Sequence, residues 1–277
     1  MIESLLFQFL LQPSFSEVTP RTLSVPAGIY LSLKSNEDQK NPPTRKKNFM
    51  GPFLQAESIF ALDIDSRTIL FEKNSRTQRQ IASISKLITA LIILEENKLD
   101  EKVMVSKNAA SIEGRKIELA PGEVITVENL LFGLLIHSGN DTALALAEHN
   151  AGTLEHFVEK MNGKVKTLGL QHTHFSNPAG LDDKENYSTA NDVALFALEA
   201  LDQPFIRDAV QIKEKEIFSV DSKIKHKLET TDDLLKDPLF PIKGLKTGNT
   251  LGAGPSFVGY TEKDGHRIIT VMLNSTD

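Results

Sequence analysis

Three stretches of the chain have a hydrophobic pattern that predicts β-hairpins. Residues 58–74 carry two short runs rich in Ile, Leu and Phe around a polar Asp-Ile-Asp-Ser sequence. Residues 213–229 alternate charged and apolar positions, as an exposed hairpin does. Residues 256–274 hold two apolar runs around Lys263-Asp264-Gly265, a favourable hairpin turn. Strands are therefore expected near both ends of the patterned sequence.

The middle of the chain is typical of helices instead. Residues 81–97 are apolar on nearly every side, which predicts a buried helix. Residues 126–150 predict two helices separated by a break at Ser138-Gly139-Asn140. Two further amphipathic helices are expected at 154–168 and 190–201.

Together these patterns predict an α/β protein of the α+β type, in which an antiparallel sheet packs against helices beside a mostly helical region. The sheet would come from residues 53–82 and 240–277, and the helical region from about 83–203. One folded domain would then span 53–277. Residues 1–52 contain several prolines and no sustained period, so we interpret them as an N-terminal tail or linker.

Composition and charge narrow the classes of function. The chain has 277 residues, of which 40% are hydrophobic and 25% charged, as in ordinary soluble globular proteins. Its formal net charge is −6, so it has no overall positive field that would favour nucleic acid as a partner. It contains no cysteine, which excludes disulfides, thiol nucleophiles, iron–sulfur clusters and cysteine zinc sites.

The N-terminus has only a weak targeting signal. No apolar stretch reaches the roughly 18–20 residues that span a bilayer. An apolar block at 5–11 is preceded by Glu3 and interrupted by Gln8, so as a secretory signal or anchor it would be degenerate or truncated. A disordered or loosely docked terminus is the alternative. A basic cluster at 45–47 would allow weak membrane association of this segment, although a solvated tail is the simpler interpretation.

Most motifs of metal, nucleotide and hydrolase sites are missing from the sequence. It has no phosphate-binding loop, no dinucleotide fingerprint, no His-Glu-x-x-His pair and no Gly-x-Ser-x-Gly elbow. His172 and His174 have no obvious third ligand. We therefore expect no metal and no cofactor.

A serine and a lysine three residues apart remain as candidate chemistry. Ser83 and Lys86 share one face at the start of the predicted buried helix. There the helix N-terminus favours an oxyanion beside the serine, and burial helps the lysine to lose its proton. A neutral lysine can accept the serine proton. The alternative is that Ser83 only caps the helix while Lys86 extends to solvent.

Two other elements add weight to this weak motif. Ser138-Gly139-Asn140 lies at the helical break, from which its side chains can point into a cleft. Lys246-Thr247-Gly248 precedes the last hairpin, where a lysine and a hydroxyl suit a carboxylate and glycine lets a substrate backbone approach. The second Ser-x-x-Lys, at 222–225, lies in an exposed charged segment, and Ser106-Lys107-Asn108 lacks the helical break, so we set both aside.

The order Ser-x-x-Lys, Ser-x-Asn, Lys-Thr-Gly resembles the penicillin-recognising serine enzymes, and most closely the low-molecular-mass D-alanyl-D-alanine carboxypeptidases of the S11 peptidase family. The resemblance extends from about residue 56 to 274. It includes the segments IASISKLITA, LAPGEVITVENLLFGLLIHSGNDTALALAEHNAG, MNGKVKTLGLQHTHFSNPAGLDD, YSTANDVA and GLKTGNT. It implies a β-lactamase/transpeptidase-like fold.

The resemblance also implies a role for each motif residue. Ser83 would be the acylated nucleophile, Lys86 its base and Ser138 a proton relay. The residues that would hold the substrate are Asn140, Lys246, Thr247, Gly248 and Asn249. Among them, Asn140 would bind the peptide backbone, and Lys246 with Thr247 the terminal carboxylate. The backbone amides of Ser83 and Asn249 would form the oxyanion hole.

The implied activity is removal of the terminal D-Ala from peptidoglycan stem peptides through an acyl-enzyme on Ser83, with β-lactams as covalent inhibitors. Such a substrate implies a location outside the cytoplasmic membrane, in the periplasm or cell envelope. Two departures from the family pattern are evident. The chain stops at Asp277, where family members usually continue into a helix that packs on the sheet. Residues 229–232 read Glu-Thr-Thr-Asp where the family often has Asn-Thr-Asn.

Three alternatives stay open. A D,D-endopeptidase acting on peptidoglycan cross-links would use the same residues. A β-lactamase is less expected, because the middle motif is Ser-Gly-Asn and no deacylating glutamate motif is evident. A truncated, catalytically inactive homologue acting as a wall-binding module is supported only by the short C-terminus.

Overall fold

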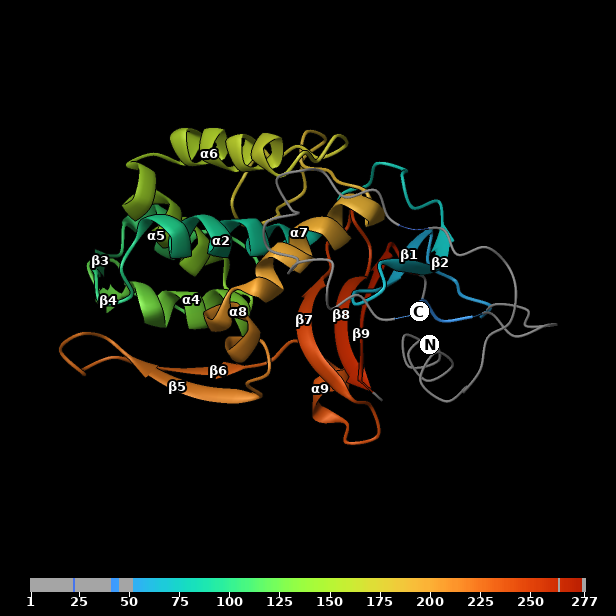
Figure 1. Ribbon diagram of the computed structural model, residues 1–277. Coiled ribbons are helices and arrows are strands. Elements are labelled where there is room, and N and C mark those ends of the chain that lie inside the picture. The colour runs from blue at the N-terminus through green and yellow to red at the C-terminus, as the bar shows by residue number, and fades with distance from the viewer. Residues whose placement is uncertain (1–21, 23–40, 45–51, 264, 276–277) are drawn as a thin grey trace.

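The computed structural model describes residues 22, 41–44, 52–263 and 265–275. The predicted apolar block at 5–11 and the basic cluster at 45–47 lie outside the described residues. Within the described part, a β-sheet stands beside a region made mostly of helices (Figure 1). No helix in this part is both long and apolar enough to cross a bilayer.

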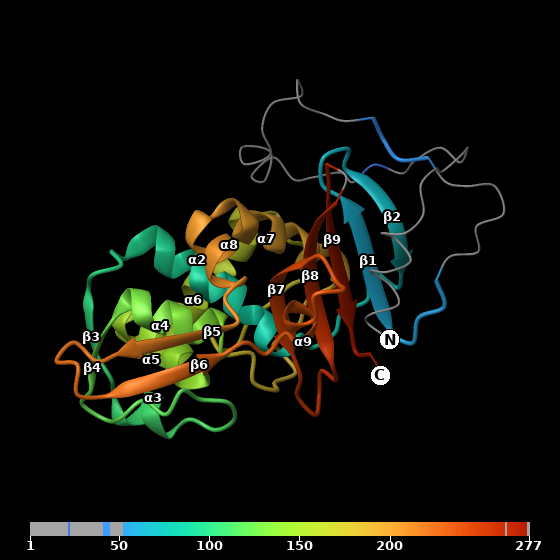
Figure 2. The same ribbon diagram turned by 90° about the horizontal axis from the view of Figure 1, so that it is seen from below.

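The main sheet is antiparallel throughout, with strand order β2-β1-β9-β8-β7. Its strands are β1 (Ser58–Asp63), β2 (Thr68–Lys73), β7 (Ile242–Gly248), β8 (Ser256–Lys263) and β9 (His266–Leu273). The hairpins predicted at 58–74 and 256–274 are confirmed. β7 is the edge strand that faces the helical region (Figure 2).

The helical region follows the predicted pattern and adds several short elements. The longer helices are α2 (Lys86–Glu96), α4 (Val127–Leu135), α5 (Asn140–Ala151), α6 (Leu154–Thr167) and α7 (Ala190–Asp202). The short ones are the 3₁₀ turn η2 (Ala82–Ser85), α3 (Lys107–Ser111), α8 (Pro204–Ala209) and α9 (Asp233–Lys236). β3 (Lys102–Met104) pairs with β4 (Val124–Thr126). β5 (Glu214–Phe218) pairs with β6 (Lys225–Glu229), which confirms the hairpin predicted at 213–229.

One hydrophobic core joins the sheet to the helices. α2 is buried over residues 86–93, and it packs against α4, α5, α6 and α7. α7 in turn packs on β9 and β1. Phe60 of β1, Leu91 of α2 and Phe196 of α7 are fully buried in this single cluster. Because burial of each such side chain contributes about 1.5–3 kcal/mol, the sheet and the helical region are firmly held together.

Threonine caps set the starts of three helices. Thr126 accepts a hydrogen bond from the backbone N–H of Asn129 at the start of α4. Thr153 and Thr189 cap α6 and α7 in the same way. Each such cap is worth about 1 kcal/mol. α4 ends at Leu135 and α5 begins only at Asn140, so the break predicted at 138–140 is confirmed.

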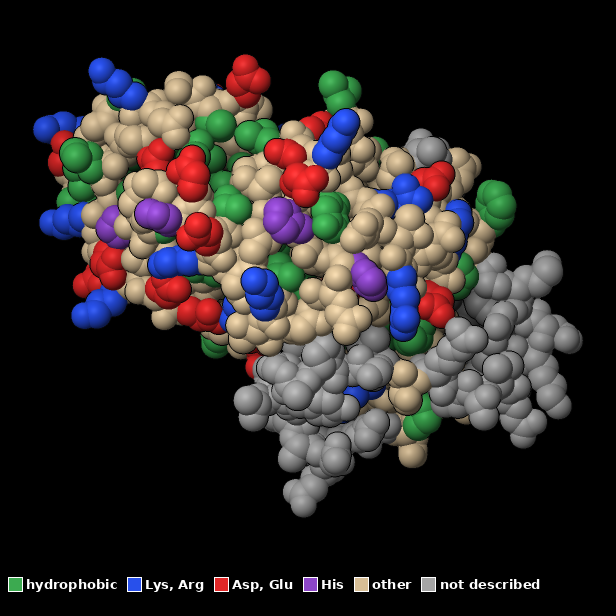
Figure 3. Space-filling model, turned by 90° about the horizontal axis from the view of Figure 1, so that it is seen from above, with side chains coloured by type: hydrophobic (Ala, Val, Ile, Leu, Met, Phe, Trp, Pro, Cys, Tyr) green, Lys and Arg blue, Asp and Glu red, His purple; other side chains and the backbone are tan. Residues whose placement is uncertain are grey.

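This architecture confirms the predicted α/β class of the α+β type, with helices packed against an antiparallel sheet. On the face shown in Figure 3, acidic and basic side chains are interspersed. The feature that matters for function is the junction between β7 and the start of α2. There the turn η2 contacts both β7 and β8.

Candidate active site

Ser83 lies in the 3₁₀ turn η2, directly before α2. The prediction that Ser83 belongs to one continuous helix over 81–97 was therefore wrong, because the α-helix begins only at Lys86. Ala82 has a positive φ of 48°, which lets the chain turn sharply before the helix. This conformation costs a non-glycine residue of the order of 1 kcal/mol or more. The turn at Ala82 holds Ser83 beside β7, the edge strand of the sheet.

Lys86 is fully buried and its amine reaches the serine. Its Nζ donates hydrogen bonds to Ser83 Oγ at 2.7 Å, Asn140 Oδ1 at 2.8 Å and the carbonyl oxygen of Ala179 at 2.7 Å. Burial lowers the pKa of Lys86 well below its usual range, and the positive charge of Lys246 lowers it further. Once the amine has lost a proton, the same contact lets the Ser83 hydroxyl donate to Nζ. A buried amine of lowered pKa in contact with a hydroxyl is what the predicted base requires.

A second serine–lysine contact lies near the first one. Lys246 on β7 donates from Nζ to Ser138 Oγ at 2.9 Å and to the carbonyl oxygen of Thr247 at 2.9 Å. Ser138 has a positive φ of 62° in the break between α4 and α5. Burial, followed by the nearby charge of Arg115, lowers the pKa of Lys246 to about 7. This amine can therefore gain and lose a proton near neutral pH.

The first turn of α5 organises the wall opposite β7. The Asn140 amide donates from Nδ2 to the carbonyl oxygen of Glu113 at 2.7 Å, while its Oδ1 accepts from Lys86. A side-chain amide nitrogen carries two N–H groups, so one remains for a substrate carbonyl. The next residue, Asp141, is fully buried and accepts from the backbone N–H groups of Ile117 and Leu119, each at 3.1 Å. The loop between α3 and β4 is thereby attached to α5.

The β7 wall presents hydroxyl groups. The hydroxyls of Thr231 and Thr247 are 2.5 Å apart, so the unusual segment at 229–232 contributes directly to this wall. Gly248 allows β7 to approach the turn η2 closely, because a Cβ added at Gly248 would lie 3.0 Å from Ala82 Cβ and 3.2 Å from Ser83 N. Gly248 is therefore needed for a close approach within the protein, and its predicted role in substrate approach stays a prediction.

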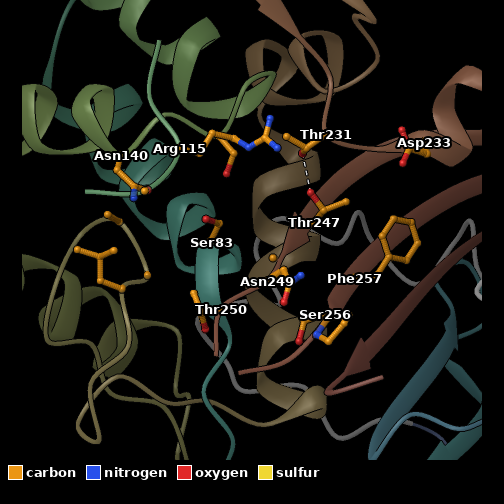
Figure 4. A pocket seen from close by; sticks show the side chains of 17 residues that line it. Ser83, Arg115, Asn140, Thr231, Asp233, Thr247, Asn249, Thr250, Ser256 and Phe257 are labelled. Atoms are coloured by element: carbon orange, nitrogen blue, oxygen red, sulfur yellow. Dashed lines mark hydrogen bonds between the residues drawn. The ribbon is translucent and has the colours of Figure 1, made fainter. Parts of the chain in front are cut away.

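A cavity of 560 Å³ opens between the two walls (Figure 4). Ser83 lies between Asn140 on one side and Thr247 with Asn249 on the other. The eight site residues predicted from the sequence all lie here: six line the cavity, and Lys86 and Lys246 are buried behind it. Their chemical roles stay predictions.

Arg115, Asp141 and Thr231 are among the residues of the site that were not predicted. Asp141 directly follows the Ser-Gly-Asn motif, which is a signal that could have suggested it. Arg115 belongs to no motif, and only the fold brings it to the cavity.

The motifs that were set aside lie elsewhere. Ser106 caps α3 by accepting from the N–H of Ala109 at 2.9 Å, and Ser222 lies in the exposed turn between β5 and β6. His174 Nδ1 is 2.6 Å from the carbonyl oxygen of Glu185. In the part of the chain that the structure describes, no group of three His, Cys, Asp or Glu side chains could hold a metal ion.

The family model of D-alanyl-D-alanine carboxypeptidases, peptidase family S11, matches residues 45–277. The chain belongs to this family. Among curated S11 relatives, the D-alanyl-D-alanine carboxypeptidase DacF of Bacillus subtilis is 37% identical over 228 residues, covering 80% of this chain and 58% of the relative. The D-alanyl-D-alanine carboxypeptidase DacC of Escherichia coli is 33% identical over 235 residues, covering 81% and 58%. The chain thus spans 58% of the length of each of these two relatives.

Solved structures agree with the S11 assignment. A D-alanyl-D-alanine carboxypeptidase from Mycobacterium tuberculosis aligns with a TM-score of 0.76 at 30% identity, over 82% of this chain and 85% of that one. A DD-transpeptidase of Streptomyces aligns with a TM-score of 0.78 at 28% identity, over 83% and 93%. The predicted β-lactamase/transpeptidase-like fold is confirmed by these likenesses.

Proposed function

We propose that this S11 protein is a serine-type D-Ala-D-Ala carboxypeptidase that removes the terminal D-Ala from peptidoglycan stem peptides. The observation that carries the proposal is the 2.7 Å contact between Lys86 Nζ and Ser83 Oγ at the edge of an open cavity. A buried amine of lowered pKa at this distance is a competent base for a hydroxyl nucleophile. The activity by which these relatives are named, D-alanyl-D-alanine carboxypeptidase, supports the substrate class.

In acylation, Lys86 takes the hydroxyl proton of Ser83 while Oγ bonds to the carbonyl carbon of the penultimate D-Ala. The backbone N–H groups of Ser83 and Asn249 stabilise the resulting oxyanion. The C–N bond to the terminal D-Ala then breaks. The leaving nitrogen takes a proton from Ser138 Oγ, which Lys246 replaces across their 2.9 Å contact.

In deacylation, water adds to the ester carbonyl carbon and passes a proton through Ser138 to Lys246. Lys86 returns its proton to Ser83 Oγ as the ester bond breaks, which restores both lysines to their starting state. The pKa of about 7 for Lys246 supports this exchange, because neither of its forms is strongly disfavoured near neutral pH.

The proposal includes β-lactams as covalent inhibitors, because they would acylate Ser83 by the same attack and place their carboxylate at Lys246 and Thr247. It also places the activity outside the cytoplasmic membrane, where peptidoglycan lies. A D,D-endopeptidase would use the same residues, and the length of peptide on the leaving side distinguishes the two activities.

The test is covalent labelling with a fluorescent penicillin, read by intact mass, in the wild type and in Ser83→Ala. The matched control is Ser222→Ala, which removes the serine of the other Ser-x-x-Lys sequence. We expect one adduct in the wild type and the control, and none in Ser83→Ala. Release of D-Ala from a peptide that ends in D-Ala-D-Ala then tests the activity itself. A folded wild type that forms no adduct would overturn the proposal.

A further inference from the structure

Arg115 is the one arginine that lines the cavity, within the part of the chain that the structure describes. It is exposed and lies on the loop between α3 and β4, which is separate in sequence from η2 and α2. Figure 4 shows its side chain extending across the cavity towards Thr231, whose hydroxyl meets that of Thr247. The guanidinium thus faces the end of the site where Lys246 and Thr247 lie on β7.

The position of Arg115 is fixed by the site itself. Its carbonyl oxygen accepts a 2.7 Å hydrogen bond from the backbone N–H of Asn140, the first residue of α5. Two residues further along the loop, Ile117 donates to the buried carboxylate of Asp141. A loop attached at two points to the wall of the active site presents its side chain in a defined direction. Such support of the backbone is typical of a residue that takes part in binding.

The charges around Arg115 would favour binding of an anion. No carboxylate within the described ranges forms an ion pair with its guanidinium, and the Asp141 carboxylate is already used by backbone N–H groups. Arg115 lies close enough to Lys246 to be the main charge that lowers the pKa of that lysine, against which Asp232 acts as the opposing charge. Two cations that lie near each other at one cavity repel, and a carboxylate that binds beside both relieves this repulsion.

We propose that Arg115 is a specificity-determining residue that binds the C-terminal carboxylate of the acyl donor, together with Lys246 and Thr247. This inference rests on the proposed function and names the substrate group that it recognises. A guanidinium supplies two parallel N–H donors that match a carboxylate, and it keeps its charge at every pH at which Lys246 titrates. A carboxylate elsewhere on the substrate is the competing source of the same chemistry.

The test compares Arg115→Gln with Lys116→Gln. The control removes a charge of the same sign from the next residue of the loop, which pairs with Glu118 at 3.5 Å and does not line the cavity. Second-order acylation rate constants are measured by intact mass with three penicillins: the free acid, its methyl ester, and an acid that carries a second carboxylate on its side chain. The KM and kcat for a D-Ala-D-Ala peptide are measured in parallel.

We expect Arg115→Gln to slow acylation by both acids equally, about 10- to 100-fold, as for the loss of a hydrogen bond between charged groups. The ester rate should change by no more than about twofold, as should every rate of Lys116→Gln. On the peptide, KM should rise more than kcat falls. Arg115→Lys should recover only part of the loss, because lysine is a point charge without the paired donors.

A second measurement separates binding from a structural role. Because Arg115 lowers the pKa of Lys246, its removal should move the limb of the acylation pH profile that belongs to Lys246 to higher pH. The inference would be overturned if Arg115→Gln slowed acylation by the free acid and by its methyl ester equally. It would also be overturned if only the penicillin with a second carboxylate on its side chain were acylated more slowly. These results differ from failure of the proposed function, in which the wild type itself would form no adduct with any penicillin.

Discussion

Asp141→Ala tests whether one buried carboxylate holds the Arg115 loop against α5. The Asp141 side chain is fully buried and accepts backbone hydrogen bonds from Ile117 at 3.1 Å, Leu119 at 3.1 Å and Thr142 at 2.9 Å. Alanine removes every one of these acceptor contacts and leaves three backbone donors to find other partners. The substitution therefore acts on the loop and on the start of α5 together.

The size of the effect follows from the number of donors. A buried N–H that loses its partner costs about 1–3 kcal/mol, so three of them cost roughly 3–6 kcal/mol when the loop can partly relax into water. A domain has a total free energy of unfolding of only about 5–15 kcal/mol, so this loss is large. Asp141→Asn keeps one acceptor oxygen and should lose less than half as much.

Urea unfolding followed by circular dichroism measures this loss, and penicillin acylation at several pH values reports on the site. Asp141 raises the pKa of Lys86, so its removal should lower that pKa further and move the acidic limb of acylation to lower pH. The reasoning would be refuted if Asp141→Ala lost less than about 1 kcal/mol, or if Asp141→Asn lost as much as the alanine variant.

Two further substitutions test the site and the loop from other directions. Gly248→Ala should slow penicillin acylation by about tenfold or more, because the new Cβ pushes β7 away from the turn η2, which holds Ala82 and Ser83. Its melting temperature should fall only slightly; unchanged acylation would contradict the close approach. The hydrogen bond from His226 to Glu123, 2.7 Å long and buried, raises the pKa of the imidazole. Its stabilisation should be fully present below the ordinary histidine pKa of about 6.5 and disappear as pH rises through the raised value. Urea unfolding of the wild type and His226→Gln between acidic and alkaline pH measures this, and a difference that grows with pH would contradict it.

The strands and the central helices could be predicted because their patterns are long enough to show a period. Both hairpins of the main sheet and the break at 138–140 were found in this way. The three-residue strands β3 and β4 are too short for any period to appear. The 3₁₀ turn before α2 was missed because a positive φ at Ala82 has no signature in hydrophobicity.

The candidate site could be predicted where chemistry and local spacing coincide. Ser83 and Lys86 are neighbours in sequence, so their contact follows from a turn of the chain. Arg115 could not be found, because its place depends on a loop without periodicity that a distant carboxylate holds. The pairing of Thr231 with Thr247 likewise needs the chain to return to β7, which sequence spacing does not reveal.

The pairing of β1 with β9 has a consequence for how the candidate site is assembled during folding. Asp63, the last residue of β1, and His266, the first residue of β9, meet at 2.9 Å and are 203 residues apart in the chain. A contact so distant in sequence needs a long loop to close before it can be made, which slows folding. β7 joins β1 only through β8 and β9, so the wall that carries Lys246 is complete only when the last strands have docked. We therefore expect the proposed acylation to require the fully docked sheet, so that a chain caught before that event should not react with penicillin.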